Sequence, residues 1–202
     1  ILREYSQLDR RIKVVFAKTN GGTSHASNRA LAEATGQFVG LLDHDDELAP
    51  DALYEVVKLL QDHRDADVVY SDEDKLDADG LRSEPFFKPD WSPEYLLSCM
   101  YTCHLTVYRK QSIDGAGGFR SRYDGSQDYD LMLRVVERTE NVFHIPKILY
   151  HWRKAAGSAA GSTGAKPYAY EAAKKALAGH LERRSMKGEL TDGQWHGHYR
   201  VR

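Results

Sequence analysis

Short apolar runs alternate with helical stripes through the first third of the chain. Runs of β-branched, aromatic and leucine side chains predict strands at residues 12–16, 38–42 and 68–70. Apolar residues that recur every three or four positions predict helices at residues 26–34, with Ser24 or Ser27 as the cap, and at residues 50–60. The middle strand is apolar on both faces, which favours a central position in a sheet. Strands separated by helices in this order predict an α/β fold with a parallel sheet.

The alternation is less regular beyond residue 76. We expect a polar turn at residues 77–83, a helix at 92–98, a strand at 105–108, a helix at 127–138 and a strand at 148–152. A stretch of Gly, Ser and Ala at residues 155–164 predicts a mobile loop before a helix with an apolar face at 172–181. Helical spacing of apolar residues at the start of the chain predicts a helix at residues 2–8, and a last strand is expected at 199–202.

Composition and charge restrict the class of protein. With 41% hydrophobic and 29% charged residues, a chain of 202 residues can bury the core of one main domain. A formal net charge of −2 does not indicate the basic surface that binding of nucleic acid generally requires. No apolar run approaches the roughly 20 residues of a membrane-spanning helix. Cys99 and Cys103 are too few for a disulfide framework or a four-ligand zinc set, so we expect reduced thiols in a cytosolic compartment. Because the chain opens at Ile1, without methionine, we expect it to begin inside a longer protein.

Acidic clusters follow two of the predicted strands. Asp43, Asp45 and Asp46 come after the second strand, and a Ser-Asp-Glu-Asp cluster at residues 71–74 comes after the third. The carboxyl ends of parallel strands meet at one crevice, and clustered carboxylates repel one another unless a hard cation collects their charge. This pattern is typical of Mg²⁺ or Mn²⁺ bound by carboxylates and substrate phosphates. The sequence leaves one alternative open, a solvated loop in which Asp46 or Asp51 caps the next helix.

A further carboxylate, Asp128, lies at the start of a predicted helix much later in the chain. Gly125 and Ser126 permit a tight entry to that helix, and the helix dipole keeps a carboxylate ionised there, although capping alone would explain one aspartate. Around the strand at residues 148–152, His151 and Arg153 offer a metal ligand and a phosphate clamp. Taken alone, such a histidine is more often structural.

The order of these motifs resembles the inverting nucleotide-sugar glycosyltransferases of family 2, which have the GT-A fold. The segments that carry the resemblance are Asn20-Gly21-Gly22, Ala26-Ser27-Asn28, Gly36 to Asp46, Tyr70 to Asp74, Phe87 to Pro93, Gly117 to Arg120, Ser126 to Leu131 and Tyr150 to Arg153. They resemble most the subgroup that builds bacterial surface polysaccharides, often as tandem domains. The resemblance implies an α/β GT-A (Rossmann-like) sheet with flanking helices.

The resemblance also implies roles for individual residues. It gives the general base as Asp128, the donor ligands as Asn28, Asp43, Asp45 and Arg153, the metal ligands as Asp45, Asp46 and His151, and the acceptor contacts as Trp91 and Asp72. A Mg²⁺ or Mn²⁺ ion would stabilise the leaving diphosphate, and the base would remove the acceptor hydroxyl proton as the anomeric centre inverts. The family usually has Glu-Asp at the base; here Gln127 precedes Asp128, so we expect the Asp128 pKa to be less raised.

Partners and domain limits follow from the same resemblance. It implies a nucleotide-sugar donor, a glycan or lipid-linked saccharide acceptor and an adjacent transferase domain in the parent protein, at a cytoplasmic location near the inner face of the bacterial membrane. Residues 1–186 are expected to be a partial GT-A domain without its first strand, helix and strand, and residues 187–202 a lead-in to a following domain. Two other functions remain open: a non-catalytic half that binds glycan or nucleotide, and a metal-dependent nucleotidyltransferase.

Overall fold

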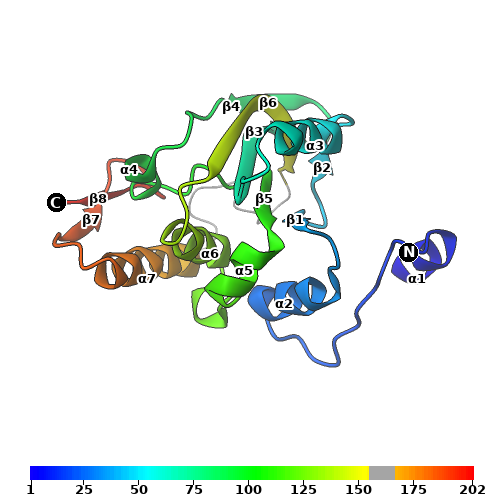
Figure 1. Cartoon of the computed structure of the whole chain (residues 1–202), viewed down its shortest axis with the longest axis horizontal. Helices are drawn as coiled ribbons and strands as arrows, with labels where there is room; N and C mark the ends of the chain where they lie inside the picture. Colours follow the sequence, from blue (N-terminus) through cyan, green and yellow to red (C-terminus); the bar gives the residue numbers. More distant parts are fainter. Residues whose placement is uncertain (155–166) are drawn as a thin grey trace.

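The structure, a computed structural model, describes residues 1–154 and 167–202 (Figure 1). The helices are α1 (Leu2–Leu8), α2 (Thr23–Glu33), α3 (Ala52–Asp62), α4 (Pro93–Leu96), α5 (Lys110–Ala116), the 3₁₀ turn η1 (Ser121–Tyr123), α6 (Gln127–Val136) and α7 (Pro167–Arg183). The strands are β1 (Phe38–Gly40), β2 (Glu47–Leu48), β3 (Val68–Leu76), β4 (Arg82–Phe86), β5 (Thr106–Arg109), β6 (Val142–Arg153), β7 (Leu190–Asp192) and β8 (Tyr199–Val201). The predicted mobile loop at residues 155–164 lies outside the described residues.

Six strands form one mixed sheet in the order β1-β5-β3-β6-β2, with β4 paired to β3. Among the described strand pairs, β3 and β6 alone are parallel, and β5 runs antiparallel to both β1 and β3. The prediction of an α/β sheet is therefore confirmed, but the prediction of a purely parallel one is wrong. The central position predicted for residues 38–42 is also wrong, because β5 separates β1 from β3 and leaves β1 at the edge.

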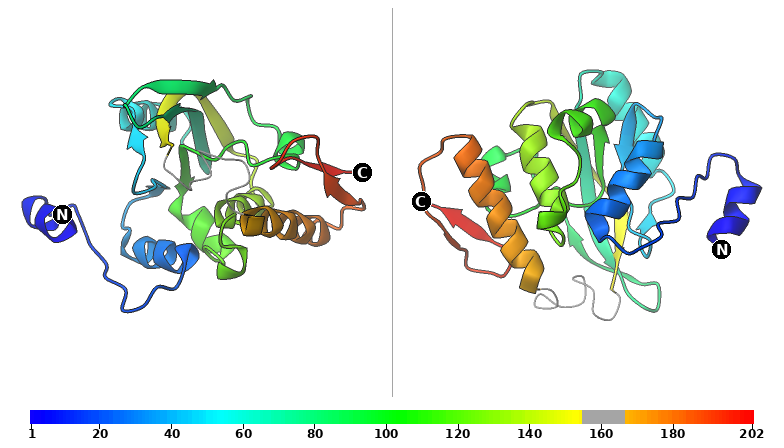
Figure 2. Two further views of the ribbon diagram at one scale, coloured as in Figure 1. Left: turned by 180° about the vertical axis from the view of Figure 1, so that it is seen from behind. Right: turned by 90° about the horizontal axis from the view of Figure 1, so that it is seen from below.

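Each face of the sheet has its own hydrophobic core, because successive side chains of a strand point to opposite faces. Val68 and Tyr70 pack on one face against α5, α6 and α7, and Val69 packs on the other against α3. Figure 2 shows this arrangement, with α6 and α7 side by side and the sheet behind them. The predicted apolar face of the helix at residues 172–181 is confirmed, since it is buried in the first core.

Helix α2 begins differently from the prediction. Its N-cap is Gly22, with no side-chain cap from Ser24 or Ser27. The Ser24 N–H instead donates to the carboxylate of Asp124 at 3.1 Å, a residue that lies a hundred positions later. A cap supplied over such a distance leaves no signal in the local sequence. It fastens the first turn of α2 to the segment that leads into α6.

The segment at residues 12–16 forms no strand in the part of the chain that the structure describes, so that prediction is wrong. Its side chains Ile12, Val15 and Phe16 are exposed. A strand needs a partner edge as well as suitable side chains, and β propensity alone does not supply one. Helix α1, which precedes this segment, is confirmed but stands apart from the sheet and buries no residue (Figures 1 and 2).

The later elements that the sequence predicts agree in type and differ in length, whereas β4, α5 and β7 were not predicted. The turn expected at residues 77–83 is the hairpin between β3 and β4, and the strand expected at 148–152 is the end of the longer β6. The last predicted strand is β8, paired with β7 in a two-stranded sheet. No helix among the described residues has the length and apolar character needed to cross a membrane.

Candidate functional site

The loop between β1 and β2, residues 43–46 and here called the acid loop, is held by the end of β6. The Tyr150 hydroxyl donates to Asp46 Oδ2 at 2.5 Å and accepts from the Asp43 N–H at 3.2 Å. The Arg153 N–H donates to Asp46 Oδ1 at 2.8 Å. Burial raises the pKa of Asp46, and the hydrogen bonds that its carboxylate accepts from Tyr150 and Arg153 oppose that rise. The loop is therefore a positioned element and not a string of freely solvated acids.

The side chain of Arg153 also binds the acid loop. Its Nε donates to the Asp45 carbonyl at 2.6 Å, and its guanidinium forms an ion pair with Glu47. The Asp45 carboxylate stays partly exposed, with His44 Nδ1 3.7 Å away. The structure thus places Arg153 beside Asp45, where its side chain braces the loop, and the donor role of both residues stays a prediction.

His104, which precedes β5, joins the acid loop to form a potential cation site. One donor atom each from Asp43, Asp46 and His104 lies within 4.8 Å of the others. The imidazole stacks on Tyr150, with ring centroids 4.6 Å apart, and lies 5.2 Å from the Trp152 ring. Sequence reasoning missed His104 and Tyr150, because both reach the loop only through strand pairing that no local pattern reveals.

Asp128 reaches the same region through Cys103. The Cys103 Sγ lies 3.9 Å from Asp128 Oδ2 and 3.5 Å from His104 Nε2. Burial raises the pKa of Asp128, the charge of His104 lowers it and that of Asp43 raises it, so these groups interact electrostatically. Asp128 and the acid loop, far apart in the sequence, therefore lie around one set of side chains.

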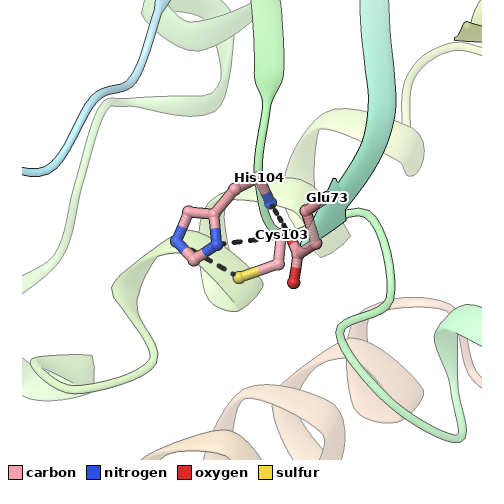
Figure 3. A group of neighbouring side chains, drawn as sticks. All are labelled: Glu73, Cys103 and His104. Carbon is pink, nitrogen blue, oxygen red and sulfur yellow. Dashed lines mark hydrogen bonds and ion pairs between the residues drawn. The ribbon is translucent and has the colours of Figure 1, made fainter. Parts of the chain in front are cut away.

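The acids at residues 71–74 do not follow β3 as predicted but lie within it, where they are buried. Glu73 Oε2 accepts from Lys88 Nζ and from the His104 N–H, each at 3.1 Å (Figure 3 shows Glu73 beside His104). Burial by itself would raise the pKa of Glu73, but the charges and hydrogen bonds of Lys88 and His104 lower it to about 2. Glu73 is thus a buried, ionised carboxylate next to the site.

Asp72 is occupied by the fold. It is 3% exposed, and its Oδ1 accepts from the Lys88 N–H at 2.9 Å and contacts His144 Nε2 at 2.8 Å. Trp91 is half-buried and stacks with Tyr101 at 6.4 Å between ring centroids. The structure does not bring Asp72 to an open surface, whereas Trp91 keeps a partly exposed ring. Their predicted contact with an acceptor stays a prediction.

The side chains of Asn28 and His151 are bonded to residues outside the acid loop. Asn28 clamps Phe119, donating to its carbonyl at 2.8 Å and accepting from its N–H at 2.9 Å. His151 Nδ1 lies 2.6 Å from Asp74 Oδ1, on the side of β6 opposite to Tyr150. The structure therefore gives Asn28 and His151 partners in the fold, and it is His104 that lies with Asp43 and Asp46.

Comparison with known proteins places the chain in a family. Residues 1–116 match the family model described as Glycosyl transferase family 2. The chain is 41% identical over 191 residues to the O-antigen biosynthesis protein RfbC of Myxococcus xanthus, covering 95% of this chain and 15% of RfbC. It is 46% identical over 189 residues to the uncharacterized protein y4gI of Sinorhizobium fredii, covering 93% of this chain and 21% of that protein. The chain thus spans about a fifth or less of the length of these relatives.

Solved structures of glycosyltransferases share the fold. S. aureus TarS 1-349 in complex with UDP-GlcNAc superposes with a TM-score of 0.67 at 20% identity, covering 89% of this chain and 53% of that one. The mannosyltransferase PcManGT of Pyrobaculum calidifontis, in complex with GDP-Man and Mn²⁺, gives 0.59 at 18% identity, covering 93% and 51%. The predicted GT-A fold is therefore confirmed.

Proposed function

Because the chain belongs to glycosyl transferase family 2, we propose that it transfers a sugar from a nucleoside diphosphate donor to a glycan or lipid-linked acceptor, with inversion at the anomeric carbon. Family membership supports the transfer of a sugar. The structural relatives bind UDP-GlcNAc or GDP-Man, which supports a nucleotide-sugar donor. The similarity to RfbC supports an acceptor that belongs to a bacterial surface polysaccharide.

The donor atoms of Asp43, Asp46 and His104 fit a divalent cation. Two carboxylate oxygens suit Mg²⁺ or Mn²⁺, the imidazole nitrogen favours Mn²⁺ of the two, and the three atoms lie within 4.8 Å of one another. A cation bound there would neutralise the negative charge that builds on the leaving diphosphate. In this proposal His104 is the histidine ligand in place of His151, while the partly exposed carboxylate of Asp45 remains available to the donor.

Asp128 is proposed as the general base. Its half-buried carboxylate has a raised pKa, so it accepts a proton more readily than a solvated aspartate does. Cys103 and His104 lie between it and the acid loop, which separates the group that takes the acceptor proton from the groups that face the diphosphate. Such a separation suits a reaction in which the acceptor hydroxyl attacks opposite the leaving group.

The observation that carries the proposal is the continuous contact from Asp128 through Cys103 and His104 to the acid loop. It is tested by measuring transfer with the full-length protein, a panel of nucleotide sugars and Mn²⁺. Asp128→Asn should lower the transfer rate by roughly 10²- to 10⁴-fold, the contribution of a general base. Asp114→Asn, a change at an exposed residue paired with Lys110 on α5, is the matched control and should leave the rate unchanged.

Three outcomes would overturn the proposal. If Asp128→Asn keeps transfer within about threefold of the wild-type rate, Asp128 is not the base. If the wild-type protein binds a nucleotide sugar but neither hydrolyses nor transfers it, the chain is a binding half of a larger transferase. A product that carries a new phosphodiester would instead identify a nucleotidyltransferase.

A further inference from the structure

Three different metal-ligating side chains meet beside the proposed donor site. Glu73 from β3 and the adjacent Cys103 and His104 each place one donor atom within 4.8 Å of the other two. Figure 3 shows the imidazole with one ring nitrogen toward the Cys103 sulfur and the other toward Glu73. The set differs from the acid loop in kind, because it contains a thiol.

The distance between the Cys103 sulfur and the His104 imidazole matches that between two ligands of one small ion. Ligands at about 2.0 to 2.3 Å from a tetrahedral Zn²⁺ lie about 3.4 to 3.7 Å from one another. Cys103 Sγ and His104 Nε2 are 3.5 Å apart, which is the edge of such a tetrahedron. Both side chains are partly exposed, so an ion can reach them from solvent.

The other ring nitrogen of His104, Nδ1, lies next to a carboxylate that can orient the imidazole when Nε2 binds a metal ion. His104 Nδ1 is buried without a hydrogen-bond partner among the described residues, although Glu73 Oε2 lies only 3.3 Å away. Lys88 keeps Glu73 ionised through a contact of 3.1 Å. A small turn of the ring would let Nδ1–H donate to Glu73, the arrangement in which a carboxylate orients a metal-bound histidine.

We propose that Cys103 and His104, with Glu73 behind the imidazole, form a second cation site that selects a thiophilic divalent ion such as Zn²⁺. Thiolate and imidazole are ligands that Zn²⁺ prefers, whereas Mg²⁺ prefers oxygen. The carboxylates of Asp43, Asp46 and Asp128 around these side chains favour a cation, and the ammonium of Lys88 is paired with Glu73.

The site has a consequence that rests on the proposed function. His104 belongs both to this site and to the proposed Mn²⁺ or Mg²⁺ site with Asp43 and Asp46. Its imidazole cannot coordinate an ion in both sites at the same time. The Cys103 sulfur also touches the proposed base at 3.9 Å. Zn²⁺ at the thiol is therefore an inhibitor of transfer supported by Mn²⁺.

The direct test is a titration of the reduced protein with Co²⁺, followed by the near-ultraviolet absorption that a thiolate bound to Co²⁺ produces. The wild-type protein should show this absorption at one ion per chain. Cys103→Ser should abolish it, and the matched control Cys99→Ser, which changes the other, buried cysteine, should keep it. His104→Gln serves as a second ligand variant, and circular dichroism checks that each variant is folded.

Competition between Zn²⁺ and a chromophoric chelator gives the affinity, which should fall at least about 100-fold in Cys103→Ser. Absence of the thiolate absorption in the wild type, or its persistence in Cys103→Ser, overturns the site. In the transfer assay with Mn²⁺, Zn²⁺ should inhibit the wild type at least about tenfold more strongly than Cys103→Ser, each relative to its own rate without Zn²⁺. An inactive protein that still shows the absorption would refute the proposed function and leave this site standing.

Discussion

The hydroxyl of Tyr150 bonds both Asp43 and Asp46 of the acid loop, and Tyr150→Phe removes it while keeping the ring that stacks on His104. The hydroxyl donates to the Asp46 carboxylate at 2.5 Å and accepts from the Asp43 N–H at 3.2 Å. A hydrogen bond to a charged group contributes about 1.5 to 3 kcal/mol and a neutral one about 1 kcal/mol. We therefore expect the free energy of unfolding to fall by about 2 to 4 kcal/mol.

Cation binding should fall as well. The hydrogen bond from Tyr150 opposes the rise that burial causes in the Asp46 pKa, so its loss leaves a proton competing more strongly with a cation. Loss of a group that orients a ligand typically weakens metal binding 10- to 100-fold, and we expect a change of about that size for Mn²⁺.

Urea unfolding and calorimetric titration with Mn²⁺ measure the two effects. The matched control is Tyr70→Phe, which removes another buried hydroxyl, one that donates to the Pro89 carbonyl at 2.6 Å. It should lower stability by about 1 to 2 kcal/mol and leave Mn²⁺ affinity unchanged. If Tyr150→Phe binds Mn²⁺ as tightly as Tyr70→Phe does, Tyr150 does not position Asp46, and the reasoning about the acid loop is refuted.

Three further predictions concern residues around the site. Asn28→Ala should lower the free energy of unfolding by about 2 to 3 kcal/mol, because two hydrogen bonds to Phe119 are lost. The affinity for UDP and GDP should stay unchanged. A large loss of this affinity in calorimetry would support the donor-binding role that the resemblance implies for Asn28. Lys88→Met should cost about 3 to 5 kcal/mol in urea unfolding, because it leaves the Glu73 charge buried and unpaired, and adding Glu73→Gln should recover part of that loss. Asp128→Asn should raise the free energy of unfolding at neutral pH. Burial raises the folded-state pKa of Asp128, so the carboxyl group stabilises the fold at pH values below its unfolded-state pKa. This stabilisation is lost as the pH rises through the folded-state pKa. Thermal unfolding from pH 3 to 8 should then show the wild type approaching the variant only at the acid end, and a variant less stable at neutral pH would contradict this.

The sequence predicts the presence of helices and strands better than it predicts which strands pair with one another. Helices with long apolar stripes, such as α6 and α7, were found because packing of one face leaves a period in the sequence. The edge position of β1 was not, because it depends on β5, a strand that comes much later in the chain and runs in the opposite direction. Pairing partners are set by the whole chain, and a local pattern does not contain them.

The candidate site shows the same limit at the level of single residues. Asp43, Asp46 and Asp128 stood out because clustered or helix-starting carboxylates need a physical reason. His104 did not, since a histidine beside a cysteine has many structural explanations, and only the fold brings it to the acid loop. Asn28 is the opposite case. The resemblance implies that it binds the donor, whereas in the structure its side chain forms two hydrogen bonds with the backbone of Phe119.

The place of β5 between β1 and β3 has a consequence for how the chain is made. During synthesis, β1 leaves the ribosome well before residues 106–109 do, so its hydrogen-bonding edge has no native partner until β5 has emerged. Non-local pairing of this kind slows folding and exposes strand edges to aggregation. Expression of the nascent chain should therefore benefit from chaperones or a lowered temperature.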